Sequence, residues 1–128
     1  MIKILLTVTT ILEGIVGIGL LVSPVLVASV LLNTPLDAAG GLFAARLGGA
    51  AIITFAICCW KARSFEIPKA AIGVVTAMLF YNFAAAAVLV YAGVRLGLQS
   101  KFIWPVIVVH VVLGLWCAVL VWFSNRKH

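Results

Sequence analysis

The chain has 128 residues, of which 66% are hydrophobic and only 9% are charged. Soluble domains carry about 25% charged residues, so this composition excludes a soluble globular protein, and it excludes disordered and fibrous proteins as well. The net charge of +6 does not indicate nucleic-acid binding. The Lys and Arg residues lie between apolar runs, where such residues orient membrane helices.

Four apolar runs are long enough to cross a bilayer, whose hydrocarbon core of about 30 Å needs about 20 helical residues. The predicted spans are residues 3–22, 40–60, 69–94 and 102–123. The first apolar run continues beyond its span to Leu32, which makes it too long for one crossing. A second, shorter helix is therefore expected directly after the first span.

Ser23-Pro24 divides the first apolar run, since Ser is favoured at a helix N-cap and Pro at the first helical position. We expect a short helix over residues 24–32 that lies at the membrane interface. A cleaved signal peptide is the alternative interpretation of the first span. Glu13 and the length of the apolar stretch favour a retained anchor.

The connections between the spans are short, so neighbouring helices are expected to run antiparallel. The sequence therefore predicts an all-α membrane protein, with one domain over residues 1–128 that forms an up-down-up-down bundle of four transmembrane helices. Arg46 lies inside a span, and Arg95 and Lys101 fall on one side of the bundle. Six cations fall on the other side: Lys3, Lys61, Arg63, Lys69, Arg126 and Lys127. Because Lys and Arg favour the cytoplasmic side, both termini are expected in the cytoplasm and the protein in the cytoplasmic (inner) membrane.

Each predicted span carries one strongly polar residue near its centre, namely Glu13, Arg46, Asn82 and His110. At 1.5 Å per helical residue, these lie at about 15, 21, 19–20 and 18 Å from the cytoplasmic edge. A charged residue at such a depth costs roughly 2.5–3.5 kcal/mol, so it faces the bundle interior, finds a partner and is a candidate for function. The four residues are therefore predicted to form one polar cluster at the bilayer midplane.

Within this cluster Glu13 and Arg46 are expected to neutralise each other, while Asn82 and His110 supply hydrogen bonds. Tyr81 can also hydrogen-bond into the cluster, although consecutive residues on a helix face different directions. The charged pair can be a structural latch, or Glu13 can carry a proton or bind a substrate. His110 can be a hydrogen-bonded interior residue, a proton relay, or a haem or chlorophyll ligand.

The sequence contains no phosphate-binding loop, nucleophile elbow or zinc-binding helix motif. Its three cysteines, Cys58, Cys59 and Cys117, lie inside apolar segments and are expected to pack there. No catalytic residue, metal or cofactor is therefore expected. On the second span, a stripe of small residues at 41, 45 and 49 favours close packing against another helix of this chain or against a second copy.

The arrangement of the chain resembles the small uncharacterised four-helix integral membrane proteins of bacteria, which are DoxX-like in the broad sense. The resemblance covers most of the chain and is carried by Glu13-x-x-x-Gly17, Ser23-Pro24, Arg46-Leu47-Gly48-Gly49, Trp60, Tyr81-Asn82, Trp104-Pro105 and His110. DoxX proteins are associated with quinone-linked sulfur oxidation and often act as membrane subunits, so the resemblance implies a membrane subunit.

The expected function is that of a non-enzymatic accessory subunit or helper in a lipid bilayer, within a homo-oligomer or a larger membrane complex. A proton-coupled small transporter is the alternative, because chain length, helix number and the position of Glu13 resemble the small multidrug resistance transporters. In that family the corresponding carboxylate binds protons and cationic drugs, and here Arg46 would compete with such a drug for Glu13. A quinone- or haem-linked redox subunit is the third alternative, with His110 as the ligand.

Overall fold

The chain forms five α-helices and no strand in the computed structural model, which describes residues 1–64 and 68–126. The helices are α1 (Ile2–Val22), α2 (Pro24–Leu32), α3 (Ala39–Ala62), α4 (Pro68–Arg95) and α5 (Ile103–Asn125). Of these, α1, α3, α4 and α5 are long and apolar enough to cross a membrane. The predicted all-α fold with four spans is confirmed, and its expected boundaries differ from the observed ones by at most two residues.

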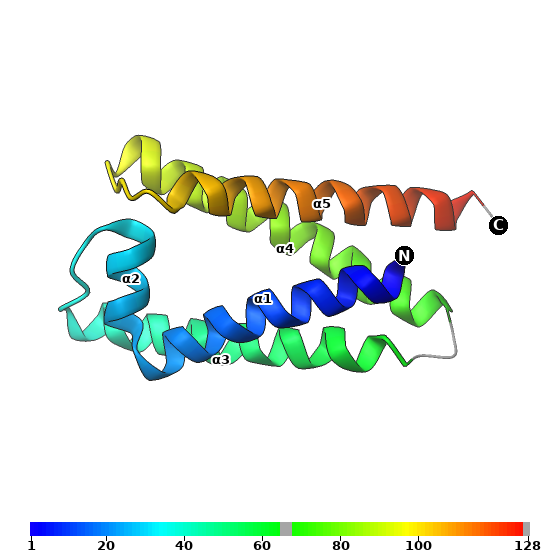
Figure 1. Cartoon of the computed structure of the whole chain (residues 1–128), viewed down its shortest axis with the longest axis horizontal. Helices are drawn as coiled ribbons and strands as arrows, with labels where there is room; N and C mark the ends of the chain where they lie inside the picture. Colours follow the sequence, from blue (N-terminus) through cyan, green and yellow to red (C-terminus); the bar gives the residue numbers. More distant parts are fainter. Residues whose placement is uncertain (65–67, 127–128) are drawn as a thin grey trace.

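The four long helices are arranged as two antiparallel pairs. Helix α1 packs along α3 and helix α4 packs along α5, whereas contacts between the two pairs are sparse. Figure 1 shows the two pairs one above the other, with both chain ends at the same end of the bundle. The up-down-up-down order predicted from the short connections is therefore the observed one.

Glycines allow the close approach of α1 and α3. A Cβ atom added at Gly49 would lie 2.8 Å from the carbonyl oxygen of Gly17 and 2.8 Å from the backbone nitrogen of Leu21. Nearer the chain termini, the Thr10 hydroxyl, which donates to the Leu6 carbonyl at 2.8 Å, also lies 3.2 Å from the carbonyl oxygen of Ala56 on α3. The small residue at position 49 therefore packs against α1 of its own chain.

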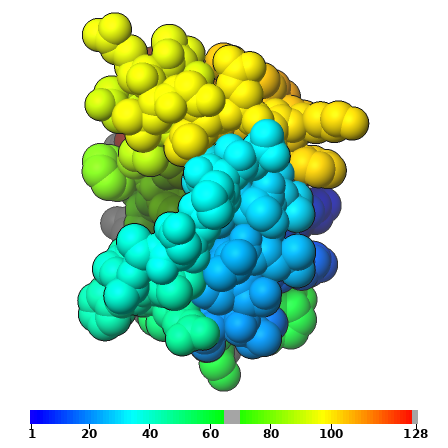
Figure 2. All heavy atoms as spheres, turned by 90° about the vertical axis from the view of Figure 1, so that its left-hand side faces the viewer, coloured from blue at the N-terminus to red at the C-terminus, as the bar shows by residue number. Residues whose placement is uncertain are grey.

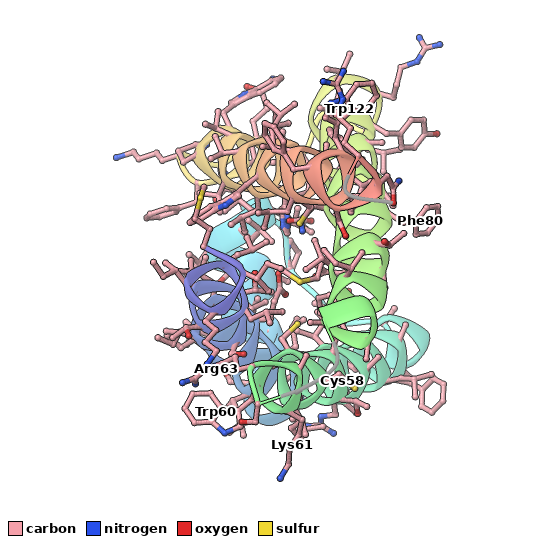
Figure 3. All side chains as sticks on the ribbon, turned by 90° about the vertical axis from the view of Figure 1, so that its right-hand side faces the viewer. Cys58, Trp60, Lys61, Arg63, Phe80 and Trp122 are labelled. Carbon is pink, nitrogen blue, oxygen red and sulfur yellow. The ribbon has the colours of Figure 1, made fainter. Side chains whose placement is uncertain are left out.

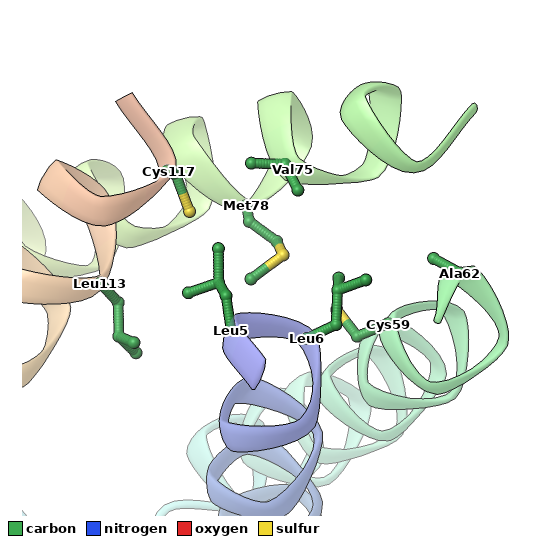
Figure 4. Packing of buried hydrophobic residues seen from close by; sticks show 8 residues of the cluster. All are labelled: Leu5, Leu6, Cys59, Ala62, Val75, Met78, Leu113 and Cys117. Carbon is green, nitrogen blue, oxygen red and sulfur yellow. The ribbon is translucent and has the colours of Figure 1, made fainter. Parts of the chain in front are cut away.

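The two pairs are joined by apolar contacts at the end where the termini lie. Eight buried residues from all four long helices meet there (Figure 4): Leu5, Leu6, Cys59, Ala62, Val75, Met78, Leu113 and Cys117. Cys59 and Cys117 thus pack in the apolar interior as predicted, whereas Cys58 is exposed on the surface of α3. A second, smaller cluster lies between α4 and α5 towards the opposite end, and Leu32 of α2 packs against it.

Helix α2 has the expected bounds and begins with Pro24 at its first position. It ends at Leu32 and is followed by Asn33, which adopts the left-handed conformation with φ of 52°. It stands across the end of the bundle, at a steep angle to the long helices (Figure 1). Viewed from that end, α2 bridges the two pairs (Figure 2). The Ser100 hydroxyl donates a hydrogen bond to the Leu31 carbonyl at 2.6 Å and fastens α2 to the connection between α4 and α5. This orientation is the one expected of a helix that lies along a membrane surface.

The outer surface of the bundle is largely apolar. Large hydrophobic side chains are exposed along all five helices, and Phe80, which points away from α4 in Figure 3, is 78% exposed. Trp60 and Trp122 also point outward near helix ends, and Trp104 is exposed at the start of α5. Apolar side chains on the outside of a helical bundle are covered by lipid tails in a bilayer, and tryptophans at helix ends are typical of the bilayer surface.

Candidate functional site

The centre of the site is Glu13, which lies midway along α1 and is only 5% exposed. The Tyr81 hydroxyl on α4 donates a hydrogen bond to Glu13 Oε2 at 2.9 Å. This bond crosses from one helix pair to the other. It is the one side-chain hydrogen bond among the described residues that joins the two pairs, since the bond from Ser100 to Leu31 instead joins α2 to the connection between α4 and α5. Glu13 and Tyr81 therefore fasten the two pairs to each other at half their length.

The next residue of α4, Asn82, is completely buried and connects α4 to α5. Its side-chain amide nitrogen donates a hydrogen bond to the Met78 carbonyl at 2.8 Å, and its Oδ1 lies 3.0 Å from His110 Nδ1. Since the amide nitrogen is used as a donor, Oδ1 must accept, and His110 Nδ1 must carry the hydrogen. In a neutral imidazole this leaves Nε2 with a free lone pair, so the structure fixes one of the two tautomers of His110.

Aromatic contacts complete the site. The Tyr81 ring packs edge-on against the His110 ring, with centroids 5.8 Å apart, and its other neighbour is the Phe55 ring of α3 at 4.9 Å. Consecutive residues on a helix are rotated by about 100°, and for this reason Tyr81 reaches α1 while Asn82 reaches α5. Glu13, Tyr81, Asn82 and His110, which we call the polar site, are thus brought together from three helices.

Arg46 does not belong to the polar site, so the expected ion pair with Glu13 is a wrong prediction. Arg46 is exposed, and it lines an open groove together with Leu21 and the start of α3. The contact between Gly49 and Gly17 sets the register of the two helices. A Cβ at Gly49 would meet Gly17, Leu20 and Leu21, so Gly49 is level with about Gly19 of α1. Arg46 comes three residues earlier on the antiparallel α3 and is therefore level with Val22, the last residue of α1, about 14 Å along the axis from Glu13.

The error arose because the sequence does not show how far α3 is shifted along α1. The first turns of α3 extend past the end of α1, where the chain has already turned into α2. At the level of Arg46 only the last residues of α1 remain, so α1 does not enclose the Arg46 side chain, which is exposed. A span boundary placed by hydropathy alone cannot reveal such a stagger between two helices.

Two further residues of the site were not predicted. Phe55 packs on Tyr81, and Thr9 is completely buried one turn before Glu13 with no hydrogen-bond partner for its hydroxyl among the described residues. The spacing of four residues between Thr9 and Glu13 places both on one face of α1, and this signal was present in the sequence. An aromatic residue such as Phe55 in an apolar span carries no comparable signal.

Within residues 1–64 and 68–126, no group of three or more His, Cys, Asp or Glu residues is arranged to hold a metal ion. The polar site holds one carboxylate, one phenol, one amide and one imidazole, which together can form hydrogen bonds and exchange protons. The four apolar spans and this buried polar site define an all-helical, multi-pass membrane protein. Comparisons with protein-family models, curated proteins and solved structures gave no match.

Proposed function

We propose that the chain is a non-enzymatic accessory subunit or helper of the bacterial inner membrane, DoxX-like in the broad sense, whose polar site holds two helix pairs in register. The hydrogen bond from Tyr81 to Glu13 is the observation that supports this role, because it joins two pairs that otherwise contact each other sparsely. A small bundle of this kind buries little surface between its halves, and membership of a homo-oligomer or larger complex would supply the missing contacts.

The latch role is also supported by how completely Asn82 is paired. Both polar groups of its side chain have partners, one on its own helix and one on α5. In a bilayer each unpaired buried polar group costs several kcal/mol, so a paired network stabilises one arrangement of the helices against others. The site thus favours a fixed spacing of the helices.

Two substitutions separate the latch from other roles of the carboxylate. Glu13→Gln keeps an oxygen that can accept the Tyr81 hydrogen bond, whereas Tyr81→Phe removes the donor. For a latch, Tyr81→Phe should lower the stability in detergent by about 0.6–2 kcal/mol, and Glu13→Gln should lower it much less. Tyr91→Phe is the matched control, because Tyr91 is 57% exposed on the same helix.

An equal loss of stability in Tyr81→Phe and Tyr91→Phe would contradict the latch. The subunit role has its own measurement, native mass spectrometry of the protein extracted in mild detergent. We expect a second copy or a defined partner to remain bound. A protein that is monomeric and alone under these conditions, and equally so in lipid nanodiscs, would contradict membership of a complex.

A proton-coupled small transporter is the second candidate, and the position of Arg46 favours it. Because Arg46 lies near the end of α1, no described cation neutralises Glu13, and the carboxylate is free to bind a proton or a cationic substrate. For this role Glu13→Gln should abolish pH-driven uptake into liposomes while leaving the fold intact. Unchanged or absent uptake by both proteins would leave the latch as the function of Glu13.

A further inference from the structure

Arg46 lies at the end of the bundle opposite the chain termini, outside the polar site. It is level with Val22, where α1 ends, and α2 crosses the bundle just beyond. If the long helices span a bilayer, this level is the boundary between lipid tails and headgroups. A guanidinium at this boundary is within reach of lipid phosphate groups.

Arg46 borders an open groove of about 500 Å³. The groove is lined by Leu21, Ala39, Leu42, Phe43, Arg46 and Leu47, so the guanidinium is its one charged group. Figure 2 views this end of the molecule, with the start of α3 in cyan at the lower left. The lining combines one cation with apolar side chains, which is suited to a ligand that is itself part anionic and part apolar.

No carboxylate among the described residues forms an ion pair with Arg46. The chain has three acidic residues in all. Glu13 is about 14 Å away along the axis and is bonded to Tyr81. Asp37 is exposed in the connection before α3, and Glu66 lies outside the described residues. A planar guanidinium binds phosphate with two parallel hydrogen bonds, so an external phosphate is a suitable partner for Arg46.

We propose that this groove is a binding site for an anionic phospholipid, with the headgroup phosphate on Arg46 and an acyl chain along the apolar lining from α3 and Leu21. A free phosphate ion has the same charge chemistry, but it would leave the apolar lining uncovered. A zwitterionic lipid would cover the lining, but it would bring a second cation next to the guanidinium. An anionic phospholipid places its phosphate on Arg46 and covers the apolar lining with an acyl chain.

The test measures which lipid stays bound to the full-length protein. The protein is reconstituted with equal amounts of phosphatidylglycerol and phosphatidylcholine, extracted in mild detergent and weighed by native mass spectrometry. We expect the wild-type protein to retain phosphatidylglycerol preferentially. Arg46→Gln should bind it at least about fivefold more weakly, the effect expected from one basic residue at a membrane surface, and Arg46→Lys should retain most of the binding.

Arg95→Gln is the matched control, because Arg95 is an exposed arginine at the same end of the bundle and does not line the groove. Its lipid retention should equal that of the wild type. Equal loss in Arg46→Gln and Arg95→Gln would show a general charge effect and overturn the proposal. Equal retention of the two lipids, or displacement of the bound lipid by excess inorganic phosphate, would also overturn it. Thermal unfolding of Arg46→Gln in detergent verifies that the exposed substitution leaves the fold intact.

Discussion

Asn82 determines which ring nitrogen of His110 carries the hydrogen, because its side chain donates one hydrogen bond through the amide nitrogen and accepts the other through the amide oxygen. The donor end is held by the Met78 carbonyl, so only the acceptor end is available to His110. An asparagine in this position acts as a selector of tautomer. It leaves the second ring nitrogen of His110 as a hydrogen-bond acceptor, and ligating histidines are oriented by the same kind of contact through their other nitrogen.

We predict that His110 in its neutral form carries its hydrogen on Nδ1. The measurement is the ¹⁵N chemical shift of the two ring nitrogens in the labelled protein in lipid, with His110→Gln used to assign the signals. In Asn82→Leu the preference should weaken, because the acceptor is lost. A hydrogen on Nε2 in the wild-type protein would contradict the proposed direction of the bond between His110 and Asn82.

The sequence could predict most of the polar site but not all of it. Glu13, Asn82 and His110 are polar residues near the centres of apolar spans, and the cost of exposing such groups to lipid is enough to place them inside the bundle. Arg46 is also a charged residue within an apolar span, so the same cost predicted that it would lie inside the bundle. In the structure its side chain lies beside the end of α1, outside the polar site. Depth along a helix is readable from sequence, whereas the stagger between two helices depends on which glycines meet.

At the scale of the helix, the distance between α1 and α3 depends on a few atoms of glycine backbone. We predict that Gly49→Ala destabilises the protein by about 1–3 kcal/mol, because the new methyl group would overlap backbone atoms of α1 that cannot rotate away. The measurement is the thermal or denaturant-induced unfolding of the protein in detergent.

Gly48 provides the matched control for that prediction. A Cβ at this neighbouring position meets no atom within 4 Å, and alanine is a better helix former than glycine by about 1 kcal/mol. Gly48→Ala should therefore leave stability unchanged or raise it slightly. If Gly48→Ala and Gly49→Ala behaved alike, helix propensity rather than close packing would explain the effect at Gly49.

Element boundaries were the most predictable part of the fold. The short helix α2 was placed correctly from Ser23-Pro24 and from the excess length of the first apolar run, which are both local signals. Its contact with the distant Ser100 was not predictable in the same way, because a hydroxyl in a loop has no sequence signature for the carbonyl that it will meet. Local backbone chemistry thus fixed where helices begin and end, and side-chain packing decided which of them touch.

At the scale of the whole molecule, the common end of both termini allows a test of orientation. With Arg46 at the opposite end, three described cations lie there against five described ones at the end of the termini, and this imbalance favours termini in the cytoplasm. In a cysteine-free background, we predict that Asp37→Cys in intact cells reacts with a membrane-impermeant maleimide and that Asn125→Cys reacts only after lysis. The reverse pattern would place the termini outside.

The division of the bundle into two pairs follows the order of the chain, since the first half of the sequence supplies α1 and α3 and the second half supplies α4 and α5. During synthesis, α1 and α3 can therefore insert and pack against each other at their glycines while the ribosome is still translating α4 and α5. During that interval Glu13 lacks its hydrogen-bond donor, because Tyr81 has not yet been synthesised. Until Tyr81 has been inserted, the carboxyl group of Glu13 lies in the interior of the membrane without its hydrogen-bond donor. Insertion machinery or a partner protein would be needed most at this stage.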